Sequence, residues 1–245
     1  MILEIAANSV ASALAAQEGG AGRVELCTAL ELGGLTPSHA QIALTRERLH
    51  IPLVVLIRPR AGDFRYSDLE CETMQRNIET CAALGCDGVV LGVLNADGKV
   101  DIARCRALIG AAGKCGVTFH RAFDLSRDPA QALEDIVALG CERILTSGAQ
   151  ASAPEGAALI RDLVVQAAGR LAVMPGAGVT AQNIAALATT TGAHEFHASA
   201  KRQLPSGMQH WRPPLSDMEC GELRSDVEQI RALAAALQAI SGEAL

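Results

Sequence analysis

Aromatic residues and long apolar runs are scarce in this sequence of 245 residues. Phenylalanine, tyrosine and tryptophan together make up 2% of it, although 49% of the positions are hydrophobic. The core must therefore consist mainly of alanine, valine, isoleucine and leucine, a composition typical of parallel strands covered by helices. No apolar run approaches the roughly 20 residues that cross a membrane, and the opening MILEIAANSV lacks the basic segment of a secretion signal. We expect a cytosolic protein without a membrane partner.

A surplus of basic residues is also missing. The chain has 21 lysine and arginine residues against 27 aspartate and glutamate residues, which gives a net charge of -6. General binding to nucleic acids is not expected, because it needs clustered cations that displace the counterions of the phosphates. None of the eight cysteines has C-x-x-C spacing, so we interpret them as small buried thiols, with Cys27 considered separately below.

Eight short apolar runs recur along the chain, each followed by a turn and a stretch with helical periodicity. They are Ile2 to Ala6, Arg23 to Cys27, Leu53 to Ile57, Gly88 to Gly92, Val117 to His120, Arg143 to Thr146, Leu171 to Pro175 and Glu195 to Ala198. An open doubly wound sheet normally has fewer strands than this. The pattern predicts a single α/β domain over residues 1–245, a (β/α)8 TIM barrel of eight parallel strands.

Several predicted helices carry start signals. Ser67 and Glu70 have the spacing of a capping box, in which each side chain satisfies a backbone N–H at the helix start. Thr36-Pro37 and Asp128-Pro129 place a capping residue before a proline at the first helical position. These signals support the alternation of strands and helices.

The C-terminal part departs from the repeating pattern. Residues 201–217 have no obvious element, and we expect an irregular loop that covers the barrel mouth or contacts a partner subunit. Ser216 and Glu219 repeat the capping-box spacing, which predicts an extra C-terminal helix over residues 218–241.

Polar residues and loop glycines collect toward the carboxyl ends of the predicted strands, the end at which barrels of this kind keep their chemistry. They are Glu4, Glu25, Cys27, Arg58, Arg60, His120, Arg121, Asp124, Ser147, Gly176, Gly178, His197 and Ser199. Strand alternation puts Glu25 and Cys27 on one face of their strand, and Glu195, His197 and Ser199 on one face of theirs. Inward-facing carboxylates need partners, and we expect Arg58, Arg60 and Arg121 to supply them. Two interpretations stay open here: a structural network of ion pairs, or a ligand site.

An anion is one ligand that this end could bind. Small loops around Ser147, Gly176, Gly178 and Ser199 let backbone N–H groups approach an anion closely, although such glycines also occur in simple tight turns. Arg58, Arg60 and Arg121 add positive charge. Glu4, Glu25, His120 and Asp124 are the candidates for proton transfer.

A metal is the other ligand considered. His194 and His197 are three apart on a strand and face opposite ways, so they cannot share an ion. His120 and His197, from different strands, are better placed, and Cys27 or Met174 could add the soft sulfur that monovalent copper prefers.

Taken together, the motifs of the chain are similar to those of the CutC copper-homeostasis family. They are Glu25-Leu26-Cys27, Gly33 to Ser38, Ile57 to Arg60 with Gly62 to Phe64, Thr118 to Asp124, Leu145 to Gly148, and Glu195 to Ser199. The resemblance extends to about Lys201. It implies a cytosolic (β/α)8 barrel that forms a homo-oligomer, a dimer or larger, and that binds Cu+. It also implies that Cys27 corresponds to a family cysteine considered for copper.

Two functional hypotheses follow. In the first, the protein handles monovalent copper without turnover, through Cys27, His120 and His197. In the second, it is an enzyme that acts on a small phosphorylated or carboxylated metabolite by acid–base chemistry at the barrel mouth. The second would explain why several charges of both signs meet at one end, since copper at a soft site does not need them.

Overall fold

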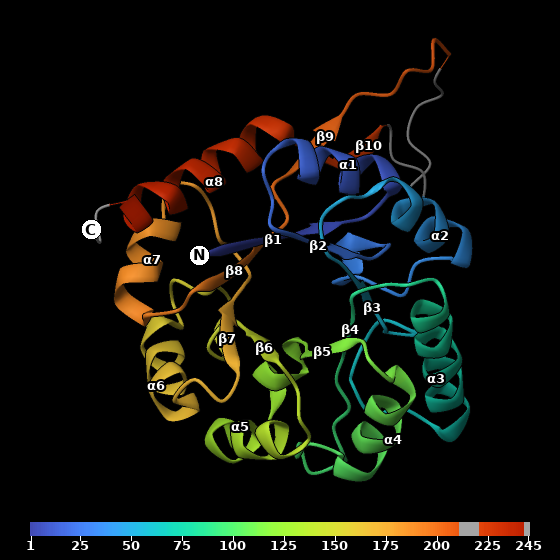
Figure 1. Ribbon diagram of the computed structural model, residues 1–245, viewed down its shortest axis with the longest axis vertical. Coiled ribbons are helices and arrows are strands. Elements are labelled where there is room, and N and C mark those ends of the chain that lie inside the picture. The colour runs from blue at the N-terminus through green and yellow to red at the C-terminus, as the bar shows by residue number, and fades with distance from the viewer. Residues whose placement is uncertain (211–220, 243–245) are drawn as a thin grey trace.

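Eight parallel strands form a ring that is surrounded by helices (Figure 1). The computed structural model describes residues 1–210 and 221–242. The strands are β1 (Ile2–Ala7), β2 (Arg23–Leu26), β3 (Leu53–Leu56), β4 (Gly88–Leu91), β5 (Gly116–Phe119), β6 (Arg143–Thr146), β7 (Ala172–Pro175) and β8 (Glu195–Ala198). The helices are α1 (Val10–Glu18), α2 (His39–Arg48), α3 (Asp68–Ala83), α4 (Ile102–Ala112), α5 (Pro129–Ala138), α6 (Ala157–Ala167), α7 (Ile184–Thr191) and α8 (Val227–Gly242). Short 3-10 turns cover Leu30–Leu32 and Arg121–Leu125.

The strand order makes the ring nearly closed. Neighbours pair in the order β7-β6-β5-β4-β3-β2-β1-β8, and every ladder between them is parallel. The strands β7 and β8 lie next to each other without a backbone ladder in the described structure. The predicted (β/α)8 barrel is confirmed, and each predicted strand lies within one residue of its observed bounds.

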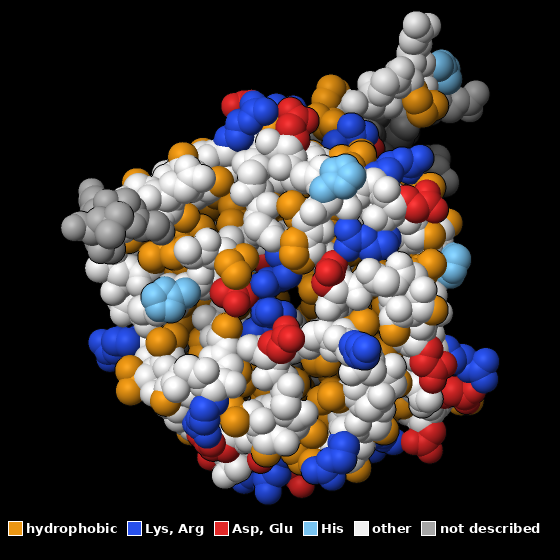
Figure 2. Space-filling view, in the orientation of Figure 1, with side chains coloured by type: hydrophobic (Ala, Val, Ile, Leu, Met, Phe, Trp, Pro, Cys, Tyr) orange, Lys and Arg blue, Asp and Glu red, His pale blue; other side chains and the backbone are white. Residues whose placement is uncertain are grey.

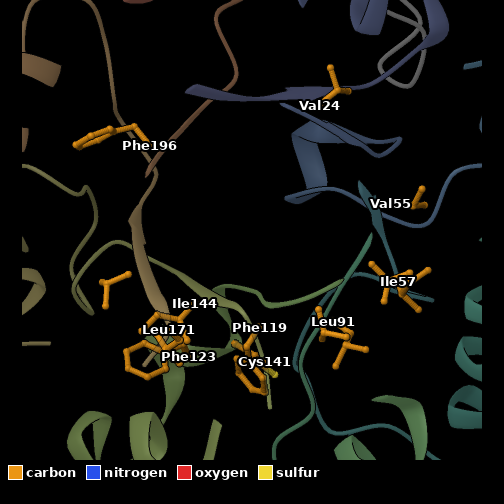
Figure 3. Close-up of a cluster of buried hydrophobic side chains, with 14 of the residues drawn as sticks. Val24, Val55, Ile57, Leu91, Phe119, Phe123, Cys141, Ile144, Leu171 and Phe196 are labelled. Atoms are coloured by element: carbon orange, nitrogen blue, oxygen red, sulfur yellow. The ribbon is translucent and has the colours of Figure 1, made fainter. Parts of the chain in front are cut away.

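Because side chains alternate along each strand, the outward face and the inward face of the ring form two separate interiors. Side chains that point outward, such as Val24, Val55 and Phe196, form the main apolar core between the ring and the helices (Figure 3). Inside the ring the apolar cluster is small, with Cys27, Val54, Leu56 and Val90. The rest of the barrel interior is largely polar, and the space-filling view shows acidic and basic side chains at its centre (Figure 2).

The helix starts were predicted in part. The capping box of Ser67 and Glu70 is present at α3, and Asp128 caps α5 ahead of Pro129. The predicted start at Thr36-Pro37 is wrong, because Ser38 caps α2 and forms a capping box with Gln41. The Thr36 hydroxyl instead accepts a hydrogen bond of 2.8 Å from the backbone N–H of Arg58.

The C-terminal prediction needs correction. The segment expected as an irregular loop over 201–217 begins with β9 (Lys201–Leu204), which pairs antiparallel with β10 (Glu222–Ser225). The helix predicted over 218–241 starts later, at Val227, where the Asp226 carboxylate accepts from the backbone N–H of Gln229. The predicted capping box of Ser216 and Glu219 lies outside the described residues. No described helix combines the length and apolar character needed to cross a membrane.

Substitution of Phe196 tests how much the apolar core between the ring and the helices stabilises the fold. Its side chain is fully buried on the outward face of β8, next to His197 in sequence. We expect Phe196→Ala to lower the free energy of unfolding by about 3–5 kcal/mol, because it removes a large apolar side chain and leaves a cavity. Denaturant titration measures this, with Val165→Ala as control, since Val165 is 73% exposed. Equal losses in both variants would contradict the expectation.

Candidate functional site

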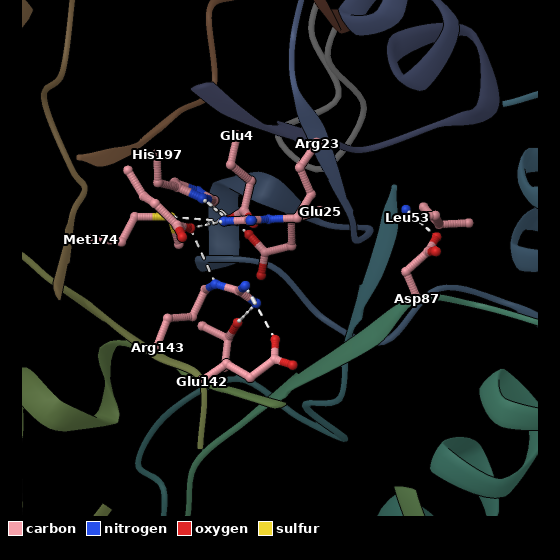
Figure 4. A network of polar contacts seen from close by, with 11 residues as sticks. Glu4, Arg23, Glu25, Leu53, Asp87, Glu142, Arg143, Met174 and His197 are labelled. Carbon is pink, nitrogen blue, oxygen red and sulfur yellow. Dashed lines mark hydrogen bonds and ion pairs between the residues drawn. The ribbon is translucent and has the colours of Figure 1, made fainter. Parts of the chain in front are cut away.

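Two arginines and two carboxylates form a network of ion pairs inside the barrel, in which Arg23 and Glu4 are buried and Arg143 and Glu195 are half-buried (Figure 4). Arg23 on β2 is paired with Glu4 on β1 and, at 2.5 Å, with Glu195 on β8. Arg143 on β6 reaches the same Glu195 at 3.2 Å. The parallel register explains the first contact, because it sets Glu4 and Arg23 opposite each other. Charges buried in this way are tolerated because each has a partner of opposite sign.

His197 joins the network to a third carboxylate. Its Nδ1 lies 2.8 Å from Glu4 Oε1, and its Nε2 lies 3.4 Å from Glu25 Oε2. Within the described residues, the Glu25 carboxylate accepts no hydrogen bond, whereas Glu4 is bound by both His197 and Arg23. The carboxylates of Glu4 and Glu25 therefore have different hydrogen-bonding environments.

The pKa values follow from these contacts. Burial of Glu25, reinforced by the nearby charge of Glu4, raises its pKa to about 7 against the opposing effects of His197 and Arg23. Burial acts on Glu4 in the same direction, but its bonds with His197 and Arg23 outweigh burial and lower its pKa to about 2. Burial disfavours the charged form of His197, but Glu25 and Glu4 outweigh it and raise its pKa. Glu25 therefore changes its protonation state near neutral pH, beside an imidazole whose protonated form is favoured.

The partners of the buried carboxylates were predicted incorrectly. We expected Arg58, Arg60 and Arg121, but the structure uses Arg23 and Arg143. Both occupy the first position of a predicted strand, where an arginine is easily taken for a solvent-facing edge. A usable signal was present in the alternation, because Arg23 is in phase with Glu25 and Cys27 and therefore shares their inward face.

A cavity of about 860 Å³ opens at the carboxyl ends of the strands. Its lining includes Glu25 and His197 at the barrel interior, and Arg58, His120, Arg121, Asp124, Gly178 and Ser199 around the mouth. Glu4, Arg60, Ser147 and Gly176 do not line it. The volume suits a small metabolite.

Arg58 and Arg60 serve different loops. The Arg58 guanidinium is buried and donates to the backbone carbonyls of Leu32, Gly34 and Gly62 at 2.8–3.0 Å. Arg60 instead pairs with Glu70 at 2.6 Å and Asp63 at 3.0 Å. Arg60 therefore braces the loop before α3, and Arg58 remains the buried cation at the cavity.

Asp124 organises the loop that follows β6. Its carboxylate accepts from the backbone N–H groups of Ser147 and Ala149 at 3.0 and 3.2 Å, and from the Thr146 hydroxyl. It also pairs with Arg121 at 2.8 Å, which in turn donates to the Ser147 hydroxyl at 2.9 Å. These bonds occupy the Asp124 oxygens, so its position favours holding the loop over transferring protons.

The predicted anion-binding corner lies between β7 and β8. Gly178 adopts a φ of 73°, a left-handed conformation that favours glycine, and lines the cavity with Ser199. Gly176 has another role, because a Cβ there would come within 2.5 Å of Leu145 and 3.3 Å of His197. Lys201 follows in β9, is exposed and lines the same cavity. This lysine was not among the predicted residues.

The three predicted copper ligands are not assembled into one site. Among the described residues, the set of three possible metal ligands whose atoms lie within 4.8 Å of one another is Glu4, Glu25 and His197. Cys27 packs in the apolar interior cluster, and its burial, with the charges of Glu25 and Glu31, raises the pKa of its thiol well above the usual range. Cu+ prefers thiolates and other soft ligands, so neither group of residues is a preformed fit for it.

The comparison with known sequences identifies the family. The profile of the CutC family matches residues 1–202. The chain belongs to the CutC family. A family protein CutC of Xylella fastidiosa strain Temecula1 is 58% identical over 231 residues, which cover 94% of this chain and 86% of that protein.

Solved structures agree with the assignment to CutC. A protein of Streptococcus agalactiae, described as a candidate copper homeostasis protein CutC, matches with a TM-score of 0.78 and 34% identity over 80% of this chain and 97% of that one. Thiamine phosphate pyrophosphorylase of Pyrococcus furiosus matches with a TM-score of 0.61, covering 98% of this chain and 96% of that one. Its 12% identity shows a shared fold alone.

The raised pKa of Glu25 predicts a pH-dependent effect on stability. The pKa is about 7 in the folded protein against an ordinary value of 4.5, so the unfolded chain loses this proton first as the pH rises. The contribution of Glu25 to stability is therefore full below pH 4.5 and is lost as the pH rises to about 7. We expect Glu25→Gln to raise the melting temperature relative to the wild type at pH 8 and to have less effect at pH 5.

Glu195→Gln is the matched control, because Glu195 is in the same interior but is paired with Arg23 and Arg143. Removing its charge takes one anionic partner from each of two arginines inside the barrel, so this variant should melt lower at both pH values. Thermal melts at the two pH values measure the difference. A Glu25→Gln variant that loses stability at pH 8 would show that the Glu25 carboxylate is stabilising in the folded protein.

Proposed function

We propose that the protein is an enzyme that binds a small anionic metabolite at the barrel mouth and moves a proton to or from it. The observation that carries the proposal is the position of Glu25. This carboxylate is buried, accepts no hydrogen bond from the described residues, and lines the cavity beside His197. A carboxylate that only stabilised the fold would have its oxygens occupied, as those of Glu4 and Asp124 are.

His197 is suited to position Glu25 and to share its proton. The Glu4 carboxylate is held by Arg23, and its contact with Nδ1 orients the ring so that Nε2 faces Glu25. The same logic orients catalytic histidines in other enzymes, where a buried carboxylate fixes the ring. Glu4 is thus a positioning residue in this proposal, and Glu25 is the group that meets the ligand.

Cations at the mouth support an anionic ligand. Arg58, Arg121 and Lys201 all line the cavity, against the carboxylates of Glu25 and Asp124, although the protein as a whole carries a net charge of -6. Positive charge concentrated in a cleft of an acidic protein attracts anions selectively to that cleft. Either a phosphate or a carboxylate satisfies this requirement.

Thermal-shift screening with phosphorylated sugars and carboxylates tests the proposal. A ligand present at 100 times its dissociation constant stabilises the folded protein by about 2.7 kcal/mol and raises its melting temperature. We expect Lys201→Glu to lose this shift, because it places a negative charge in the cavity lining. Lys114→Glu is the control, since Lys114 is exposed in the connection between α4 and β5, at the opposite end of the barrel.

The ligands found in this way then test proton transfer. In D2O, the wild type should exchange a carbon-bound proton of the ligand, which NMR detects. Glu25→Gln should slow the exchange by about 100-fold or more while the ligand still binds, because a general base contributes at least that factor. Absence of any stabilising ligand across the library, or unchanged exchange in Glu25→Gln, would contradict the proposal.

Binding of monovalent copper is the second candidate function. Cys27 favours it, since this thiol lines the cavity and is a soft ligand, and the description of the Streptococcus agalactiae relative points to copper homeostasis. Titration with Cu+ against a competing chelator measures the affinity. If copper is bound through Cys27, Cys27→Ser should weaken binding by more than tenfold and Cys105→Ser should not, because Cys105 is buried on α4 away from the cavity lining. Equal weak binding in all three proteins would exclude this site.

A cytosolic location and a homo-oligomer are further parts of the proposal, and they rest on the family resemblance. Light scattering of the purified protein measures the assembly directly, and a monomer at micromolar concentration would contradict it.

A further inference from the structure

By distance and angle, two buried N–H groups of residues that line the cavity have no hydrogen-bond partner among the described residues, although the Tyr66 hydroxyl lies beside the Arg58 guanidinium. They are Arg58 Nε, two residues after β3, and His120 Nε2, directly after β5. Both residues line the cavity at the barrel mouth. A buried polar group without a partner is costly, so two of them at one ligand cavity indicate a function that the folded chain alone does not fulfil.

The hydrogen bonds of His120 fix its state. Its Nδ1 accepts from the backbone N–H of Ala122 at 3.2 Å, so the ring proton resides on Nε2. Burial, reinforced by the nearby positive charge of Arg58, lowers the pKa of His120 to about 3. His120 is therefore a neutral ring whose Nε2–H can donate, and it is unsuited to be the base that the sequence suggested.

Arg58 supplies the charge beside this donor. Its terminal nitrogens are bound to the carbonyls of Leu32, Gly34 and Gly62, which fixes the guanidinium in place. In the part of the chain that the structure describes, Arg58 forms no ion pair with a carboxylate, whereas Arg60 and Arg121 do. A rigid, buried cation without an anion favours a negatively charged oxygen.

Phe64 connects the two donors to the cavity. Its ring centroid lies 4.8 Å from the His120 ring and 5.1 Å from the guanidinium carbon of Arg58, and the ring also lines the cavity. An aromatic face beside two N–H donors suits a flat group that ends in an oxygen. The arrangement differs from the β7–β8 corner, where Gly178, Ser199 and Lys201 line the same cavity.

We propose that Arg58 and His120 bind the carbonyl oxygen of the substrate, and that the substrate is a small anionic carbonyl compound with a proton on the adjacent carbon. This inference rests on the proposed function. Glu25 accepts the proton from carbon, the electron pair of the C–H bond forms a carbon–carbon double bond, and the carbonyl π electrons move to oxygen. The resulting enolate oxygen is held by the two N–H groups. Return of the proton from Glu25 to the same or a neighbouring atom completes the reaction without an oxidant or a reductant.

Oxalate is a suitable probe, because it is flat and resembles the enediolate form of such a substrate. Calorimetry should detect binding to the wild type, at least tenfold tighter than that of acetate. His120→Asn keeps an acceptor near Nδ1 but has no donor at the position of Nε2, and we expect it to weaken oxalate binding ten- to hundredfold. His120→Gln places an amide N–H near the position of Nε2 and should stay within about threefold of the wild type. Labelling with 15N-histidine gives a second readout, since oxalate should shift the Nε2–H signal of His120.

The outcomes separate this inference from the proposed function. Equal oxalate affinity in the wild type and in a folded His120→Asn variant overturns the inference, as does acetate binding as tight as that of oxalate. If oxalate does not bind, but another anion binds and transfers a proton to Glu25, the proposed substrate class is wrong and the proposed function stands. If no anion binds the wild type, both are wrong. Arg58→Lys supports the inference if it folds and weakens oxalate binding, but the His120 pair decides, because Arg58 also holds three loop carbonyls.

Discussion

Arg23 lies between two carboxylates inside the barrel, and much of the site depends on this arrangement. It pairs with Glu4 on one side and Glu195 on the other, and its side chain also reaches the sulfur of Met174 on β7. Because Glu4 is held in the charged state, it can fix the ring of His197. His197 in turn sets the environment of Glu25. The environment of Glu25, the carboxylate that lines the cavity, thus depends on contacts that begin at Arg23 and pass through Glu4 and His197.

The same series of contacts explains how one barrel holds two carboxylates whose pKa values are shifted in opposite directions. Glu4 and Glu25 occur on adjacent strands and are both almost fully buried, yet the pKa of one is lowered and that of the other is raised. The difference comes from partners, because Arg23 and His197 both bind Glu4, whereas within the described part of the chain Glu25 has only the longer contact with His197. Environments that shift the pKa values of two acidic groups in opposite directions are typical of acid–base sites.

The sequence was sufficient for the fold and only partly sufficient for the site. The eight apolar runs predict the strands because parallel strands are buried on both faces, and alternation correctly places Glu25 and His197 on inward faces. The pairing of Glu4 with Arg23 and His197 depends on lateral register between strands, which a single sequence does not contain. The carbonyl contacts of Arg58 depend on loop conformation in the same way. The β9–β10 pair was missed because its exposed strands lack an apolar pattern.

The ring of strands has a seam between β7 and β8, the neighbouring strands that are not joined by a backbone ladder in the described structure. Every other neighbouring pair is joined by backbone hydrogen bonds, whereas here Arg23 on β2 contacts one side chain from each strand, Met174 on β7 and Glu195 on β8. The cavity corner with Gly178 and Ser199 lies directly above this seam, since these residues follow β7 and β8. A ligand bound there would touch both sides of the seam at once. Binding at this corner would therefore favour the arrangement in which β7 and β8 lie side by side.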